Sequence, residues 1–199
     1  MPQGLALQQT IDSRGLRPIS LTVSGDRVYV LNAGGTVGGE DAIAGFIKNE
    51  EGLLEYLSDS SFSLSESYTR PAQIGLSPSG SNLVVTERET HKITVIALDE
   101  TGRPNSSYSR DSEGLTPFGF EFGVRDSHVI AEGVLGLENA SSVSSYSFGP
   151  DDNLDVVTSS ALTRQTAACW LALSTDKKIA YTTNPGSDSI SHFSLDFKG

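Results

Sequence analysis

The sequence predicts an all-β protein, and three features of its 199 residues indicate this class. Short segments alternate apolar and polar residues, as in Leu21/Val23 and Ile74/Leu76, and a period of two is typical of strands with one buried face. Clusters of Ser, Gly and Asp separate these segments, as expected of turns. The nearest helical candidate, residues 49–57, is short, and we interpret it as a turn followed by a strand.

The same pattern recurs four times. Gapless stretches of similar sequence begin at Pro18, Pro71, Pro117 and Ala168. They lie roughly 50 residues apart, and self-similarity at such a period is the signature of repeat architectures. Each start predicts a first strand and then a turn.

Further strands follow in each repeat. The second strands are expected over residues 27–31, 82–86, 128–131 and 178–182, and the third strands over residues 42–47, 92–98, 142–148 and 189–195. A fourth strand closes the first three repeats, after hairpin turns such as those at residues 99–102 and 151–153. Four-stranded units of this length, arranged radially, form a β-propeller. The alternative is a β-sandwich with repeat-like strands.

We expect one domain over residues 1–199, with blades at about 17–69, 70–115, 116–166 and 167–197. The last blade lacks an outer strand, and residues 5–11 resemble an outer strand without a blade. Three arrangements are consistent with the missing outer strand and with the extra strand at residues 5–11. The terminal strand closes a four-bladed ring, two chains form an eight-bladed ring, or the chain is a fragment of a larger propeller with open edges. Open blade edges also make a homodimer an expected partner.

Charge and composition exclude several classes. The 14 Lys and Arg against 25 Asp and Glu give a net charge of −11, which argues against nucleic-acid or anionic-membrane partners. No run of 18 apolar residues is present, so no membrane helix is expected. The first residues lack a leader pattern, and a cytoplasmic location is expected. The lone Cys169 excludes an intrachain disulfide and cysteine-based zinc, and no cofactor is expected.

Several runs resemble one family. They are Arg-Pro-Ile-Ser-Leu-Thr-Val (17–23), Val-Tyr-Val-Leu-Asn-Ala-Gly-Gly (28–35), Pro-Ala-Gln-Ile-Gly-Leu-Ser-Pro-Ser-Gly (71–80), Val-Val-Thr-Glu (84–87), Thr-Pro-Phe-Gly-Phe-Glu-Phe (116–122) and Gln-Thr-Ala-Ala-Cys-Trp (165–170). The chain is similar in these runs to the lactonase family of β-propellers, which includes relatives of 3-carboxymuconate cyclase and 6-phosphogluconolactonase. Family members of this kind are seven-bladed and longer, so the resemblance implies a truncated member. It also implies an enzyme that opens or closes a lactone ring on an anionic small molecule. The alternatives are a non-catalytic binding or scaffold propeller and an inactive fragment.

Blade topology indicates where a site lies. In an antiparallel blade, the loop entering strand one and the loop leaving strand two share a face of the ring. The entering loops hold Arg17, Arg70 and Arg164, and the leaving positions align as Asn32, Glu87, Glu132 and Asn184, with His91 just beyond. Arginines bind carboxylates and phosphates bidentately. We therefore expect the arginines and asparagines to bind the substrate.

The same face supplies candidates for proton transfer. His91 fits by its ordinary pKa, and Glu87 or Glu132 fits if partial burial raises its pKa. A structural alternative is that the arginines pair with these glutamates across neighbouring blades. Another is that the two carboxylates and two amides bind a cation such as calcium, which nearby arginines oppose, so no metal is expected. His128 and His192, within predicted strands, are interpreted as packing or surface residues.

Overall fold

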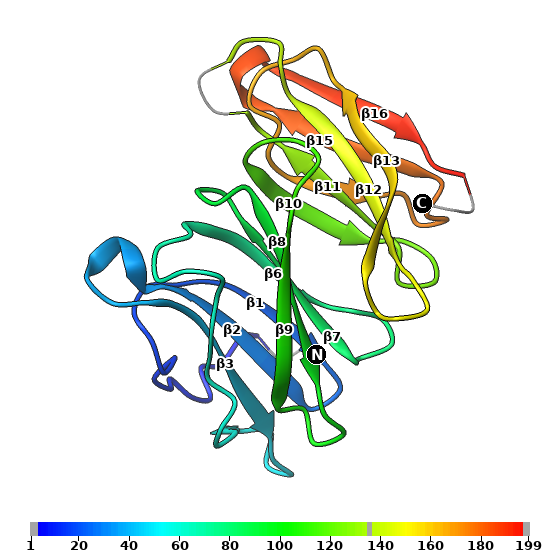
Figure 1. Cartoon of the computed structure of the whole chain (residues 1–199). Coiled ribbons are helices and arrows are strands. Elements are labelled where there is room, and N and C mark those ends of the chain that lie inside the picture. Colours follow the sequence, from blue (N-terminus) through cyan, green and yellow to red (C-terminus); the bar gives the residue numbers. More distant parts are fainter. Residues whose placement is uncertain (1–3, 135–136, 197–199) are drawn as a thin grey trace.

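The computed structural model describes residues 4–134 and 137–196. Within these ranges the chain forms four antiparallel sheets, which follow one another in sequence order. Figure 1 shows them stacked side by side, from the blue N-terminal sheet to the red C-terminal one. We call them blades 1 to 4. This is the partial β-propeller that the repeats predict.

Each blade is a meander in which consecutive strands pair, except that β5 of blade 1 pairs with β3 rather than β4. Blade 1 contains β1 (Pro18–Ser24), β2 (Arg27–Ala33), β3 (Asp41–Lys48), β4 (Leu54–Tyr56) and β5 (Phe62–Ser63), with the 3-10 helix η1 (Gly34–Val37). Blade 2 contains β6 (Pro71–Leu76), β7 (Asn82–Glu87), β8 (Lys92–Leu98) and β9 (Pro104–Asp111). Blade 3 contains β10 (Pro117–Phe122), β11 (His128–Glu132), β12 (Ser142–Phe148) and β13 (Leu154–Leu162). Blade 4 contains β14 (Leu171–Leu173), β15 (Ile179–Asn184) and β16 (Ser189–Ser194), with the 3-10 helix η2 (Pro185–Ser187).

One predicted strand is absent. Residues 5–11 form no strand, and Leu5 and Leu7 are exposed. Instead, the side chain of Gln9 accepts a hydrogen bond from the Leu54 N–H at 2.8 Å and donates one to the Leu54 carbonyl at 2.9 Å. The segment therefore lies against the outer strand β4 of blade 1, and the expectation that residues 5–11 form an outer strand is wrong. No core receives Leu5 and Leu7.

The hydrophobic core lies between the blades. Each blade packs one face, its forward face, against the rear face of the blade that follows it in the chain. The first core joins Tyr29, Leu31 and Ile43 of blade 1 to Ile74 and Val85 of blade 2. Two further cores repeat this arrangement between blades 2 and 3 and between blades 3 and 4. Because burial of one such side chain contributes roughly 1.5–3 kcal/mol, these three contacts hold the blades in order.

The two strand histidines have different surroundings. His128 is fully buried on the rear face of blade 3. Its ring stacks on Tyr146 at 5.6 Å between centroids and lies near Phe120, Phe122 and Phe148. His192 is exposed on β16. His128 is thus a packing residue and His192 a surface residue.

Candidate functional site

A non-glycine residue with a left-handed backbone conformation precedes the first strand of every blade. Arg17, Arg70, Thr116 and Ala167 occupy this position, and their φ angles are 59°, 47°, 59° and 62°. In the first three blades its carbonyl accepts a hydrogen bond from an N–H at the end of the second strand, namely that of Ala33, the last residue of β2, or of Arg88 or Gly133, just after β7 and β11. Left-handed backbone at a non-glycine residue costs of order 1 kcal/mol or more and persists only where the surroundings hold it. Because they share this conformation and this position, Arg17 and Arg70 lie at the same end of neighbouring blades.

Those two arginines share a pocket with a third. A pocket of about 280 Å³ is lined by Arg17, Ile19, Ala33, Thr36, Tyr68, Arg70, Pro71 and Arg88, and we call it the arginine pocket. Arg17 donates to the Thr36 hydroxyl at 2.6 Å, and Arg88 donates from Nε to the Arg70 carbonyl at 3.0 Å. These bonds fix the guanidinium groups without neutralising them.

The charge of Arg88 is the least compensated. Burial lowers the pKa of Arg88, and the nearby charges of Arg70 and Arg17 lower that pKa further, against a smaller opposing effect of Cys169. Its guanidinium lies over the Phe118 ring at 5.2 Å. Arg70 pairs with Glu89 at 3.4 Å, but both side chains are partly exposed, and such pairs are weak. The pocket therefore favours an anion.

Arg88 also borders a second pocket, which contains His91. This pocket of about 270 Å³ is lined by Arg88, Glu89, His91, Leu115, Thr116, Val134 and Leu137. The Thr116 N–H donates to Nδ1 of His91 at 3.1 Å. Because Nδ1 accepts, the neutral ring carries its proton on Nε2. His91 is therefore oriented as a proton donor at Nε2.

Glu87 and Glu132 occupy equivalent positions at the ends of β7 and β11, and both are fully buried. Glu87 accepts hydrogen bonds from the Ser65 N–H at 3.2 Å, the Thr90 hydroxyl at 2.7 Å and the Thr94 hydroxyl at 2.5 Å, and it also contacts the Ser65 hydroxyl. Ser65 lies in the loop that leads into blade 2.

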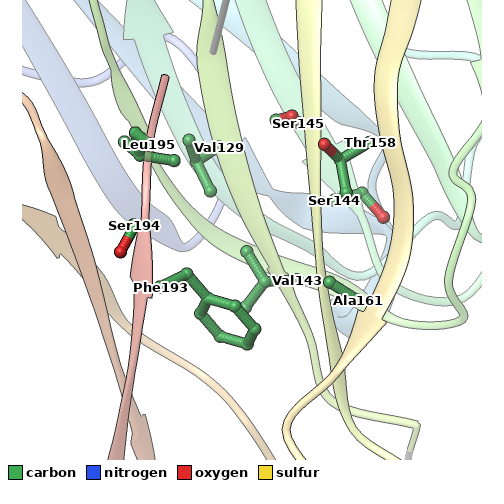
Figure 2. Close-up of a pocket in the computed structure, with 9 residues that line it drawn as sticks. All are labelled: Val129, Val143, Ser144, Ser145, Thr158, Ala161, Phe193, Ser194 and Leu195. Atoms are coloured by element: carbon green, nitrogen blue, oxygen red, sulfur yellow. The ribbon is translucent and has the colours of Figure 1, made fainter.

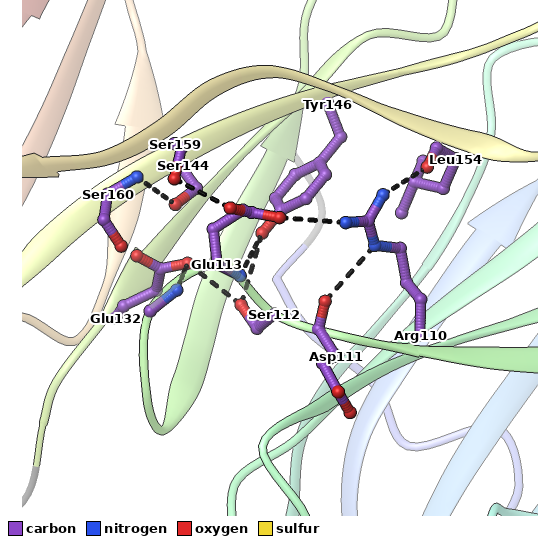
Figure 3. A network of polar contacts seen from close by, with 11 residues as sticks. Arg110, Asp111, Ser112, Glu113, Glu132, Ser144, Tyr146, Leu154, Ser159 and Ser160 are labelled. Atoms are coloured by element: carbon purple, nitrogen blue, oxygen red, sulfur yellow. Dashed lines mark hydrogen bonds and ion pairs between the residues drawn. The ribbon is translucent and has the colours of Figure 1, made fainter.

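Glu132 repeats the arrangement one blade later. It accepts from the Ser112 hydroxyl at 2.9 Å, the Gly114 N–H at 2.8 Å and the Ser142 hydroxyl at 2.5 Å. Figure 3 shows it beside Ser112, with Glu113 bridging Arg110 and Ser159 nearby. Both glutamates thus bind the loop that leads into their own blade, and neither lines the arginine pocket or the His91 pocket.

In blades 1 and 4 an asparagine occupies the position that Glu87 and Glu132 occupy in blades 2 and 3. Asn32, the second-to-last residue of β2, is buried and donates to the Ser13 carbonyl at 3.1 Å, in the loop leading into blade 1. Asn184 donates to Ser189 and Ser191, and Ser189 in turn donates to Gln165, in the loop leading into blade 4. We call Asn32, Glu87, Glu132 and Asn184 the strand-end residues. All four connect a strand end to a lead-in loop, directly or through one serine.

The three arginines predicted to bind the substrate do not all lie in one pocket. Arg17 and Arg70 meet in the arginine pocket, whereas Arg164 is exposed in the loop before blade 4 and lines neither pocket. The expected cross-blade pairing of arginines with Glu87 is also not formed within the described chain, since the carboxylate partner of Arg70 is Glu89. Across residues 4–134 and 137–196, no group of three His, Cys, Asp or Glu side chains is placed to hold a metal ion.

Sequence analysis missed Asp41. This buried carboxylate begins β3 and accepts from the Thr69 N–H at 2.6 Å, the Thr69 hydroxyl at 3.0 Å and the Arg70 N–H at 3.0 Å. It therefore holds the backbone of Arg70 in place. Glu89 was also missed, although it lies between Glu87 and His91 in the sequence.

A smaller cavity of about 70 Å³ lies between blades 3 and 4. Figure 2 shows its lining, which includes Val129 and Val143 on one side and Phe193 and Leu195 on the other. Its polar lining consists of serine and threonine hydroxyls. Without a charged group, this cavity is a packing gap rather than an anion site.

Solved structures share this fold, whereas no family model and no curated protein matches the sequence. A provisionally named 6-phosphogluconolactonase from Bacteroides fragilis matches with a TM-score of 0.69 and 18% identity, over 92% of this chain and 55% of that one. A second, from Bacteroides uniformis, matches with a TM-score of 0.70 and 16% identity, over 94% and 55%. The periplasmic gluconolactonase of Pseudomonas aeruginosa gives 0.66 and 18%, over 92% and 55%.

These structural similarities identify the fold class of the chain. The chain has the β-propeller fold that lactonases of this type share, and it spans about half the length of the solved structures it matches. At such identities the likeness concerns the fold alone, and function depends on the residues of the site. Among the residues that the structure describes, no helix has the length and apolar character needed to cross a bilayer.

Proposed function

We propose that the chain binds an anionic small molecule in the arginine pocket and opens or closes a lactone ring held there. The observation that carries this proposal is the cluster of Arg17, Arg70 and Arg88 around one pocket. The lactonase fold of its structural neighbours supports the reaction class. Substrates of the carboxymuconate or 6-phosphogluconolactone type both carry the required anion, and the reaction needs no cofactor.

The arginines would hold the anionic group of the substrate. Guanidinium groups bind carboxylate or phosphate oxygens in pairs, and an anion relieves the repulsion that lowers the pKa of Arg88. Asp41 contributes indirectly, because it fixes the backbone of Arg70. The ligand is thereby oriented before any bond changes.

Ring opening needs a proton donor for the leaving oxygen. Water adds to the lactone carbonyl, the ring C–O bond breaks, and the departing alkoxide takes a proton. We assign Glu89 as the base that takes a proton from the attacking water and then passes it to the alkoxide. Nε2 of His91, in the same pocket, donates a hydrogen bond to that oxygen, because Nδ1 already accepts from Thr116. Arg88 borders both pockets and is placed to stabilise the oxyanion. Ring closure runs through the same groups in reverse.

Glu87 and Glu132 are assigned a positioning role. Their burial and hydrogen bonds to the lead-in loops support this role better than the acid/base role expected from the sequence. Replacing both by Gln tests the assignment. Turnover that survives both changes excludes them as acid or base, whereas a selective loss of kcat in a folded variant would restore the acid/base role.

Turnover of 6-phosphogluconolactone, compared with uncharged gluconolactone, tests the proposal as a whole. We expect the phosphorylated lactone to be preferred and Arg88→Gln to remove that preference. Arg125→Gln, which changes an exposed arginine on blade 3, is the matched control. His91→Asn keeps an acceptor for the Thr116 N–H but removes the donor, so kcat should fall about 10²–10⁴-fold with little change in substrate affinity.

A non-catalytic binding propeller is the second candidate. One observation favours it: Arg70 already engages Glu89, the carboxylate assigned as the base. This function predicts saturable binding of 6-phosphogluconate, measured by calorimetry, without turnover of either lactone. Turnover that depends on His91 would reject it.

A further inference from the structure

The two end faces of the stack expose apolar side chains at positions that are buried elsewhere in the repeat. Leu21 on the rear face of blade 1 is 61% exposed, whereas the residues in the same register, Ile74, Phe120 and Leu171, are at most 8% exposed. Val23, on the same face of β1, is exposed too. In blades 2 to 4 the preceding blade covers this position.

The forward face of blade 4 is exposed as well. Ile190 is 70% exposed, whereas its equivalents Ile43, Ile93 and Val143 are at most 4% exposed. Tyr181, on the neighbouring strand β15, is also exposed, while its equivalents in blades 1 to 3 are buried. In those blades the following blade covers this position.

The two exposed positions are partners in every internal contact. Ile43 and Ile74 belong to the first core, Ile93 and Phe120 to the second, and Val143 and Leu171 to the third. Each pair joins the Ile190 position of one blade to the Leu21 position of the next. The same contact between a forward face and a rear face occurs three times within the chain. The rear face of blade 1 and the forward face of blade 4 are the two surfaces of this kind that no blade of the described chain covers.

Leu21 and Ile190 lie on the first and last blades, at opposite ends of the stack (Figure 1). We propose that two copies of this chain associate head to tail, with the rear face of blade 1 of each copy packed on the forward face of blade 4 of the other. Two such contacts close a ring of eight blades. Propellers normally contain four to eight blades, so two copies close a ring within that range, whereas three would exceed it.

The association itself rests only on the repeated interblade contact and not on the proposed activity.

Sedimentation equilibrium of the whole chain over a concentration series tests the proposal. We expect twice the chain mass of 21.1 kDa for the wild type. Leu21→Lys and Ile190→Glu should each weaken association about a hundredfold or more, because each buries an unpaired charge. Both side chains are exposed in the single chain, so the variants should fold, which circular dichroism verifies. Val37→Glu, an equally exposed apolar position on η1, is the control and should keep the wild-type mass.

Mixing the two variants gives the sharpest result. In the mixed pair, one contact is unmodified and the other places the introduced lysine against the introduced glutamate, so the two-chain mass should return. A wild type that remains a single chain up to about 100 µM, a concentration at which contacts of micromolar affinity are saturated, overturns the proposal. Assemblies that grow without limit exclude a closed ring. Loss of pairing in Leu21→Lys alone, with Ile190→Glu unaffected, would show rear-to-rear pairing instead.

Discussion

Acidification should destabilise this protein through one buried histidine. His128 is fully buried among four aromatic rings, and its Nε2 has no hydrogen-bond partner among the residues that the structure describes. Burial lowers the pKa of His128 from 6.5 to about 4, and a weak contact with the Asp126 carbonyl opposes this only slightly. The equivalent positions in the other blades hold the apolar residues Val28, Leu83 and Ala180. The histidine is therefore an exception within the repeat.

The direction of the effect follows from proton uptake. Between pH 6.5 and about pH 4 the unfolded chain protonates this histidine while the folded chain does not. Unfolding therefore becomes easier as pH falls through that window. One pKa unit corresponds to about 1.4 kcal/mol, so His128 alone should remove about 2 kcal/mol of stability between pH 7.5 and pH 5, and about 3 kcal/mol once pH 4 is reached.

Replacement by leucine should abolish this loss. His128→Leu roughly conserves volume, which cores tolerate best, and it matches Leu83 at the same position in blade 2. Urea denaturation at pH 7.5, 6.5, 5.5 and 5.0 gives the free energy of unfolding at each pH. The pH 5 limit keeps the comparison above the range where the lowered pKa values of Asp99 and Asp176 contribute.

The difference between variant and wild type isolates the histidine. We expect the wild type to lose about 2 kcal/mol more than His128→Leu between pH 7.5 and 5. His192→Gln, at an exposed histidine, is the control and should keep the wild-type slope. A variant that loses as much stability as the wild type would refute the argument, since the ring would then be protonated in the folded state.

Three further predictions concern the strand-end contacts and the pocket. Glu132→Gln should cost about 1–3 kcal/mol in urea denaturation, because the Gly114 N–H and two serine hydroxyls lose a charged acceptor; a cost below about 0.5 kcal/mol would contradict the positioning role. Gly114→Ala should lower the thermal midpoint, because its Cβ would lie 2.1 Å from Oε2 of Glu132; an unchanged midpoint would show that the loop moves freely. Arg88→Gln should weaken phosphate binding about tenfold or more in calorimetry, and equal affinity in the variant would remove Arg88 from the site.

The strands were predictable because their signal is local and repeated. Alternation of period two places β7, β8 and β12 to within one residue of their observed bounds. The turns that follow β8 and β12 carry the expected Asp, Gly and Asn. Residues 5–11 show where this signal fails. Leu5 and Leu7 alternate like a strand, but a strand also needs a neighbouring edge and a core, which are tertiary properties.

The site was predictable in position but not in side-chain direction. Sequence alignment placed Glu87 and Glu132 correctly at strand ends, yet their carboxylates turn toward Ser65 and Ser112 in the lead-in loops. That choice depends on hydroxyl and N–H donors in loops distant in the sequence, which no local residue pattern reveals. Arg88, in contrast, follows Glu87 directly and is brought into the pocket by its own backbone bond to Arg70.

The placement of charge fits selection of a small anion. With a net charge of −11, the molecule repels extended polyanions, whose charges must approach a large area of its surface. A single phosphate or carboxylate needs only the local field of Arg17, Arg70 and Arg88, where burial first and then the charges of Arg70 and Arg17 lower the pKa of Arg88. The buried carboxylate of Asp41 binds backbone N–H groups, including that of Arg70. Asp41 thus fixes the backbone of Arg70 without pairing with its guanidinium, and the carboxylate that does pair with Arg70, Glu89, is partly exposed. This leaves the pocket cationic within an acidic protein.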